Sequence, residues 1–189
     1  MGRASMSSRQ RAVFLDRDGV LNRALVRDGK PFPPASPSEL EIMPDTAALV
    51  ELKALGFLLL VVTNQPDVAR GTQKREIVDA IHDRLKAVVP LDDIFVCYHT
   101  DSDRCDCRKP EPGLIFRAAE KHAIDLTASY LIGDRWRDIE AGERAGCKTV
   151  LIDYGYSEQN PRLGPSIRVT SLREATDWIV SQNQRESAA

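Results

Sequence analysis

Five short apolar runs, separated by helical patterns, constrain the fold of this chain most strongly. The runs are nearly continuous and rich in Val, Ile and Leu, which is typical of strands buried on both faces of a sheet. Strands that alternate with helices are joined by right-handed crossovers, so the sequence predicts an α/β domain with a parallel sheet covered on both faces. The expected strands are 12–15, 57–62, 94–98, 130–132 and 149–152, and the expected helices are 45–55, 73–89, 113–122, 139–145 and 171–181.

The length of 189 residues corresponds to about one domain. We expect that domain over 11–182, with disordered tails at 1–10 and 183–189. A formal net charge of −2 with 6% aromatic residues disfavours a nucleic-acid surface. The longest apolar run, 57–62, is too short to cross a bilayer, and no apolar core of a secretory signal follows the basic N-terminus. We therefore expect a cytoplasmic protein that binds neither membranes nor nucleic acid.

Polar residues follow four of the five expected strands. The carboxyl ends of parallel strands meet at one edge of a sheet, and ligands bind at that edge, so we expect the chemistry of the chain there. These residues are Asp16 and Asp18, Thr63 and Asn64, Cys97 and His99, and Gly133 and Asp134.

The segment Asp16-Arg-Asp18-Gly19 carries two carboxylates two residues apart, directly after the first expected strand. Both can converge on one cation, and Gly19 permits a sharp turn after them. Oxygen ligands with room for water suit Mg²⁺, and a bound cation makes a carboxylate usable as a nucleophile towards a phosphate. The alternative is an Asp-Gly turn whose acids are solvated.

Two further motifs carry groups that suit a phosphate. Thr63 and Asn64 offer a hydroxyl and an amide to a phosphoryl oxygen, although both also suit a helix or turn cap. Arg108 and Lys109 offer cations to oxyanions, although neighbouring surface charges are common.

A third motif supplies more carboxylates. Asp134 and Asp138 lie four residues apart at the start of an expected helix and can share one side of it. Acids in a first turn also stabilise the helix dipole without any ligand. The metal interpretation requires Asp134 to lie close to Asp16 in the folded chain.

The four motifs, in this order, resemble those of the haloacid dehalogenase superfamily over about residues 12–155. That family has a Rossmann-like sheet and hydrolyses phosphate esters through an aspartyl-phosphate. The resemblance implies that Asp16 is the nucleophile and Asp18 the acid and base, while Thr63 and Lys109 bind the transferring phosphoryl group. Hydrolysis needs both an acid and a base, which one cycling carboxyl group can supply, so a phosphatase is favoured over a dehalogenase that lacks it.

The same resemblance implies a catalytic metal. Mg²⁺ would be held by the side chains of Asp16 and Asp134 and by the main-chain carbonyl of Asp18. Asp138 would steady this cluster or Lys109.

Residues 97–107 contain three cysteines and one histidine. Their number and i, i+2 spacing match a closed tetrahedral zinc site, so we interpret the zinc as structural. A disulfide is disfavoured in a cytosolic chain, and core packing is disfavoured by the polar residues around them. Such a loop would fix the direction of the lysine that follows it. The expected ligands are Cys97, His99, Cys105 and Cys107.

With this loop, the resemblance narrows to the branch that contains heptose-bisphosphate and histidinol-phosphate phosphatases. We expect hydrolysis of a small phosphorylated metabolite of the heptose type, with histidinol phosphate as the alternative. Heptose enzymes usually have Ser-Gly after Thr-Asn-Gln, whereas this chain has Pro66-Asp67, so a second phosphate is held differently or is absent. A non-catalytic zinc-loop binding module and an inactive phosphatase-like scaffold are the remaining alternatives.

Residues 23–41 form the one long irregular stretch, with four prolines between 31 and 37. They are too few for a cap domain, so we expect a capless phosphatase with a flap at its site. Arg108 could then fork onto a substrate hydroxyl or a distal phosphate. The expected state is a monomer or small homo-oligomer, with His82 and His122 at the surface and Cys147 buried.

Overall fold

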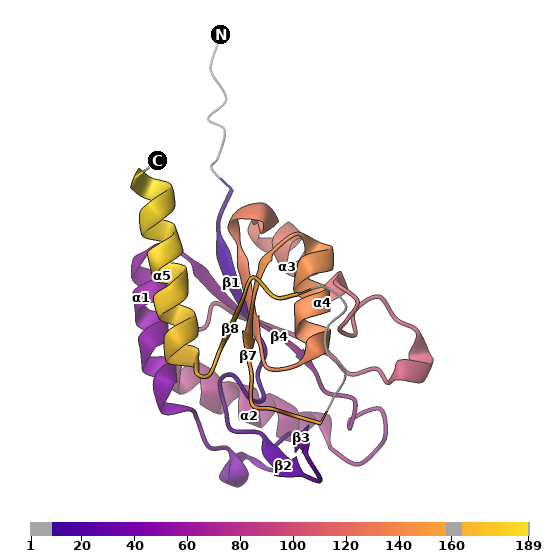
Figure 1. Cartoon of the computed structure of the whole chain (residues 1–189). Coiled ribbons are helices and arrows are strands. Elements are labelled where there is room, and N and C mark those ends of the chain that lie inside the picture. The colour runs from indigo at the N-terminus through magenta and orange to yellow at the C-terminus, as the bar shows by residue number, and fades with distance from the viewer. Residues whose placement is uncertain (1–8, 158–163, 189) are drawn as a thin grey trace.

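Six parallel strands form the central sheet of the computed structural model, which describes residues 9–157 and 164–188 (Figure 1). Their spatial order is β5-β4-β1-β6-β7-β8, and Phe14 of β1 pairs with Leu60 on one side and Leu131 on the other. The expected fold class is confirmed. The strands are β1 (Ala12–Leu15), β4 (Leu58–Asn64), β5 (Asp93–Cys97), β6 (Tyr130–Gly133), β7 (Lys148–Ile152) and β8 (Ile167–Val169).

Helices cover both faces of this sheet (Figure 1). Alternate side chains of a strand point to opposite faces, so Val13 of β1 packs in one core and Phe14 in the other. The first core lies under α1 (Leu49–Ala54), α2 (Arg75–Val88) and α5 (Leu172–Ala188), and the second under α3 (Gly113–His122) and α4 (Trp136–Ala145). Each fully buried Val, Leu or Phe stabilises the fold by about 1.5–3 kcal/mol.

Strand β1 lies in the middle of the sheet, at the point where the strand order reverses: β4 and β5 are added on one side of it, and β6, β7 and β8 on the other. Strand β4 lies on one side of it and β6 on the other, so their carboxyl ends converge. Asp16, Thr63 and Asp134 stand at these ends. This is the place where open α/β sheets bind ligands, as the sequence predicts.

The irregular stretch 23–41 contains a short antiparallel hairpin of β2 (Leu25–Arg27) and β3 (Lys30–Phe32). A 3-10 turn, η1 (Pro37–Glu39), follows it, and a second, η2 (Pro44–Ala48), precedes α1. The described residues also contain the 3-10 turns η3 (Asp101–Asp103) and η4 (Leu126–Ala128).

Three expectations need correction. Helix α5 continues to Ala188, so the domain boundary predicted at 182 is too early. The tail predicted for 1–10 is too long, because the Gln10 main-chain N–H donates to the Ala123 carbonyl at 3.0 Å; residues 1–8 lie outside the described part. His82, expected at the surface, is buried, with 6% exposure, and its ring contacts Arg17 from α2.

Cys147 packs in the second core, as expected. Among the residues that the structure describes, no helix is both long enough and apolar enough to cross a bilayer.

Candidate active site

Asp16 follows β1 directly and is 8% exposed. Its Oδ1 atom lies 2.9 Å from the ammonium of Lys109 and accepts a hydrogen bond from the main-chain N–H of Arg17 at 2.7 Å. Burial raises the pKa of Asp16 to about 6, although Lys109 opposes this rise. The carboxylate is thus fixed in direction and points at a cation.

Lys109 is the buried cation of the site, with 3% exposure. Its ammonium contacts Asp16 at 2.9 Å and Asp138 Oδ1 at 2.6 Å, and it donates to the Val62 carbonyl at 2.7 Å. Burial opposes its charge, but Asp138 and Asp16 raise the pKa of Lys109 to about 12. The lysine is therefore charged whenever the site is folded.

Asn64 holds the main chain of this lysine. Its amide donates to the Lys109 carbonyl and accepts from the Lys109 N–H, both at 3.1 Å. The two bonds tie the end of β4 to the segment after the cysteine-rich loop. Its side chain thus serves Lys109, and the phosphate contact predicted for Asn64 remains a prediction.

Three buried carboxylates meet beside Lys109, from Asp16, Asp134 and Asp138, with ligand atoms within 4.8 Å of one another. Within the described residues, neither carboxylate oxygen of Asp134 has a partner in full hydrogen-bond geometry, although the Tyr156 hydroxyl lies close enough to lower the pKa of Asp134. Burial, followed by the charges of Asp16 and Asp138, raises the pKa of Asp134 well above its usual range. A buried carboxylate with so little hydrogen bonding is costly, and a divalent cation with oxygen ligands removes that cost, so these residues fit Mg²⁺.

Gly19 lets Asp134 approach. A Cβ atom at this position would lie 1.8 Å from the Asp134 Oδ2 atom, and the φ angle of +85° disfavours any side chain. The Gly19 noted in the sequence is therefore required both by the turn and by the carboxylate packed against it.

Asp18 is held by a network that the sequence did not predict. The guanidinium of Arg17 contacts its Oδ2 atom at 2.8 Å, and Asn22 and Gln65 donate to its carboxylate at 3.0 and 2.9 Å. Burial alone would raise the pKa of Asp18, but Arg17 and the hydrogen bonds from Asn22 and Gln65 lower it. The Gln65 amide also donates to the Thr63 hydroxyl at 2.9 Å, which leaves the hydroxyl hydrogen of Thr63 free to point elsewhere.

A cavity of about 530 Å³ opens above these groups. Its floor includes Asp16, Thr63 and Lys109, and Phe32 of the β2–β3 hairpin forms part of its wall. The hairpin thus borders the site, as the flap expectation requires. Its cationic lining residues are Arg70, Arg108, Lys109, Arg135 and Arg137.

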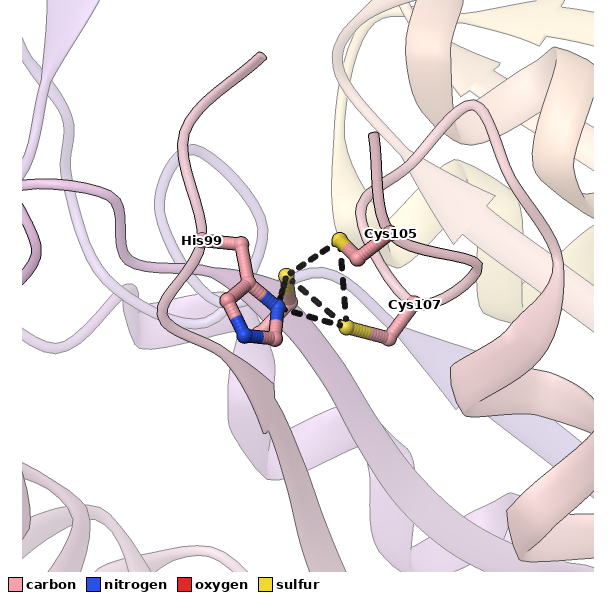
Figure 2. A group of neighbouring side chains, drawn as sticks. His99, Cys105 and Cys107 are labelled. Atoms are coloured by element: carbon pink, nitrogen blue, oxygen red, sulfur yellow. Dashed lines mark hydrogen bonds between the residues drawn. The ribbon is translucent and has the colours of Figure 1, made fainter. Parts of the chain in front are cut away.

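The four predicted zinc ligands come together beside this cavity. Figure 2 shows the ring of His99 and the sulfurs of Cys105 and Cys107 turned towards one point. The Cys97 sulfur lies 3.8 Å from that of Cys105 and 3.1 Å from that of Cys107, and none of the three forms a disulfide. Ligands at about 2.3 Å from zinc lie about 3.8 Å apart in a tetrahedron, so the donor set fits that metal.

Arg108 follows this loop and is bound by it. Its Nε donates to Asp101 Oδ1 at 2.8 Å and its Nη1 to the His99 carbonyl at 3.3 Å. Arg137 reaches the same Asp101 atom at 2.9 Å from helix α4, a contact that its place in the sequence does not indicate. Two arginines therefore share one exposed carboxylate at the rim of the cavity.

Residues 106–175 match the sequence profile of HAD-hydrolase-like proteins, the class that the sheet order and the acidic cluster also indicate. The chain belongs to this haloacid-dehalogenase-like family, on the branch of the D-glycero-manno-heptose-1,7-bisphosphate 7-phosphatases. The resemblance drawn from the four motifs is confirmed.

Two relatives and one crystal structure support this assignment. The D-glycero-β-D-manno-heptose-1,7-bisphosphate 7-phosphatase of Helicobacter pylori strain J99 is 34% identical over 92% of this chain and 99% of its own. The enzyme of that name from Bordetella bronchiseptica is 34% identical over 93% and 98%. The crystal structure of D,D-heptose 1,7-bisphosphate phosphatase from B. bronchiseptica, complexed with magnesium and phosphate, superposes with a TM-score of 0.74 at 28% identity, covering 92% of this chain and 99% of that one.

Proposed function

We propose that this chain removes the 7-phosphate from a D-glycero-manno-heptose 1,7-bisphosphate in a Mg²⁺-dependent reaction. The observation that carries the proposal is the buried contact of Lys109 with Asp16, next to a buried Asp134 carboxylate whose ligand atom lies within 4.8 Å of those of Asp16 and Asp138. This arrangement supplies a fixed nucleophile, a fixed cation and a metal site at one point. The substrate follows from the named relatives, which share about a third of the sequence.

In the first step, the Asp16 carboxylate attacks phosphorus while the bond between phosphorus and the C7 oxygen breaks. Lys109 and the Thr63 hydroxyl offset charge on the phosphoryl oxygens, and Asp18 gives a proton to the leaving alkoxide. Burial favours the protonated form of Asp18, whereas Arg17 and the hydrogen bonds lower its pKa, and a substrate phosphate anion beside it would shift that pKa upwards, so that the carboxyl group can carry the proton. The product is a phosphate ester on Asp16 and a free sugar hydroxyl.

In the second step, Asp18 takes a proton from a water molecule that attacks the phosphorus of this ester. The bond to Asp16 breaks, and inorganic phosphate leaves with the nucleophile restored. Mg²⁺, when held by Asp16, Asp134 and the Asp18 carbonyl, neutralises charge on the phosphoryl group and orients it. Asp138 stays on Lys109 and keeps it aligned.

The rim of the cavity suits a second phosphate. Arg108 and Arg137 already bind one carboxylate oxygen, so their donors converge on an anion. Asp67, which would repel a phosphate, is paired with Arg70 at 3.0 Å. The departure Pro66-Asp67 from the usual pattern is therefore compatible with a bisphosphate bound by these arginines.

We also propose that Cys97, His99, Cys105 and Cys107 hold a structural zinc ion. The compact donor set with ligand atoms within 4.8 Å of one another supports this role. The ion would fix the loop that carries Asp101 and leads into Arg108, and through it the direction of Lys109.

The proposal is tested by phosphate release from a substrate panel. The panel contains D-glycero-D-manno-heptose 1,7-bisphosphate in both anomeric forms, fructose 1,6-bisphosphate, histidinol phosphate and p-nitrophenyl phosphate. Mg²⁺ is omitted in a parallel series rather than chelated, so that zinc stays in place. We expect the highest kcat/KM with a heptose bisphosphate and no turnover without Mg²⁺. A preference for histidinol phosphate would overturn the heptose assignment, and metal-independent turnover would overturn the mechanism.

A further inference from the structure

Arg17 is a completely buried arginine that lies between Asp18 and helix α2, with 0% exposure. Its Nη2 atom donates to Asp18 Oδ2 at 2.8 Å and to Gln65 Oε1 at 3.0 Å, and its Nε atom donates to Asp18 Oδ1 at 3.2 Å. The guanidinium plane and the Asp18 carboxylate are thus locked to each other. A buried guanidinium is costly unless its remaining donors are also satisfied.

His82 satisfies the donor on the far side of this plane. Its Nε2 atom lies 3.2 Å from Arg17 Nη1, and the ring is 6% exposed. An arginine has no acceptor, so Nε2 must accept and the ring proton must sit on Nδ1. Burial, aided by the charge of Arg17, lowers the pKa of His82 to about 4, so the ring is neutral and remains an acceptor at physiological pH.

We propose that His82 is a positioning residue for catalysis: it fixes the guanidinium of Arg17, and that guanidinium aims the Asp18 carboxyl group at the leaving oxygen of the substrate. The inference rests on the proposed role of Asp18 as acid and base. It adds Arg17 and His82 to the site, which then reaches from the sheet edge into helix α2. It also gives a function to a histidine that contacts neither the proposed metal ligands nor the proposed phosphate site.

Removal of the His82 Nε2 acceptor should affect the protonation of the leaving group more than the other steps of the reaction. Without His82, the Nη1 donor loses its partner and the guanidinium can rotate, so the Asp18 carboxyl group spreads over several directions. A sugar alkoxide leaves poorly and needs a well-placed proton, whereas p-nitrophenolate leaves well without one. A misplaced Asp18 therefore slows hydrolysis of the heptose bisphosphate and has little effect on hydrolysis of the aryl phosphate.

The experiment compares His82→Ala, His82→Gln and a control on the same helix. In His82→Ala we expect kcat on D-glycero-D-manno-heptose 1,7-bisphosphate to fall by ~10-fold or more, within the ~10²-fold cost of a small misplacement, and kcat on p-nitrophenyl phosphate to fall less than ~3-fold. His82→Gln, which offers a carbonyl acceptor, should restore most of the lost rate. Ile81→Val, at the neighbouring buried position, should lower Tm without changing the ratio of the two rates.

A double variant makes the test specific. In an Asp18→Asn background, His82→Ala should change neither rate by more than ~2-fold, because a residue that acts through Asp18 has no effect once Asp18 is gone. An equal loss on both substrates, no loss on either, or full additivity with Asp18→Asn would overturn the inference. None of these results touches the proposed function, which is tested by the substrate preference and the Mg²⁺ dependence of the unaltered protein.

Discussion

At the scale of single residues, charge balance selects the ion. Asp16, Asp134 and Asp138 bring three buried carboxylates together, and Lys109 is the ammonium that contacts two of them. With all four groups ionised, this cluster carries a surplus of two negative charges in a place where water cannot screen them. Asp134 has to be protonated or to meet a cation, which its raised pKa also indicates. A dication cancels the surplus, and this is the electrostatic reason that the site suits Mg²⁺.

The nucleophile gives the most direct prediction. Asp16→Asn keeps the shape of the side chain and removes the attacking charge, so we expect turnover to fall by a factor of at least ~10³. Asp153→Asn is the matched control, since Asp153 also follows a strand but lies exposed and pairs with Arg168 at the surface. The rate of Mg²⁺-dependent phosphate release is measured for both variants. Near-normal activity in Asp16→Asn would contradict the covalent mechanism.

The second aspartate predicts a dependence on the leaving group. Asp18→Asn should spare Mg²⁺ binding, because the expected ligand there is the main-chain carbonyl. Turnover of a sugar phosphate should fall by roughly 10²–10⁴-fold, and that of p-nitrophenyl phosphate should fall less. Steady-state rates on the two substrates check this, together with the Mg²⁺ concentration at half-maximal rate. Equal losses on both would argue against the acid and base role.

At the scale of elements, the sequence pattern predicted the helices and strands that are long or strongly apolar. Strand β1 and helix α3 have the predicted bounds, because an apolar run or a helical face decides them locally. Strand β8 was missed, since its three residues include Arg168 and only pairing with β7 makes them a strand. The β2–β3 hairpin was likewise hidden in a proline-rich stretch that lacks strand alternation.

The cysteine-rich loop is an element whose conformation we expect to depend on its metal. Protein purified without chelator should contain about one zinc per chain by elemental analysis. Cys105→Ser should lower the zinc content and Tm together, because a closed tetrahedral site loses a ligand. Cys147→Ser alters a buried thiol outside the cluster, so it should lower Tm at most while the zinc content stays unchanged. Zinc-free protein, or an unaffected Cys105→Ser variant, would show that the loop binds no zinc.

At the scale of the whole molecule, the site is assembled from segments far apart in the chain. The sequence placed Asp16, Lys109, Asp134 and Asp138 correctly in one cluster because ordered motifs at strand ends converge in a parallel sheet. It missed Gln65 and His82 as partners of the Arg17 network. The spacing of His82 from Val78 and Leu85 places it on the buried face of α2, but a helical pattern does not show which residue of another element lies opposite. Contacts between side chains of different elements can be identified only once the three-dimensional arrangement of those elements is known.

The cavity as a whole predicts how substrate is selected. Arg108 lies at its rim, with a side chain 11% exposed, and it is aimed there by Asp101 and the His99 carbonyl. Arg108→Ala should raise KM for the heptose bisphosphate and lower kcat/KM. The corresponding loss of transition-state binding free energy should be about 1.5–3 kcal/mol, the usual contribution of a hydrogen bond to a charged group. Turnover of p-nitrophenyl phosphate should hardly change, because that substrate has no second phosphate to bind.

The matched control for this prediction is Arg168→Ala. Arg168 also pairs with an aspartate, Asp153, at 3.0 Å, but it is half-exposed and does not line the cavity. We expect its loss to leave kcat/KM unchanged on both substrates. Equal effects of Arg108→Ala on the bisphosphate and the aryl phosphate would instead show that Arg108 acts on the shared phosphoryl site. In that case the distal phosphate would have to rely on Arg137, which approaches the same carboxylate from helix α4.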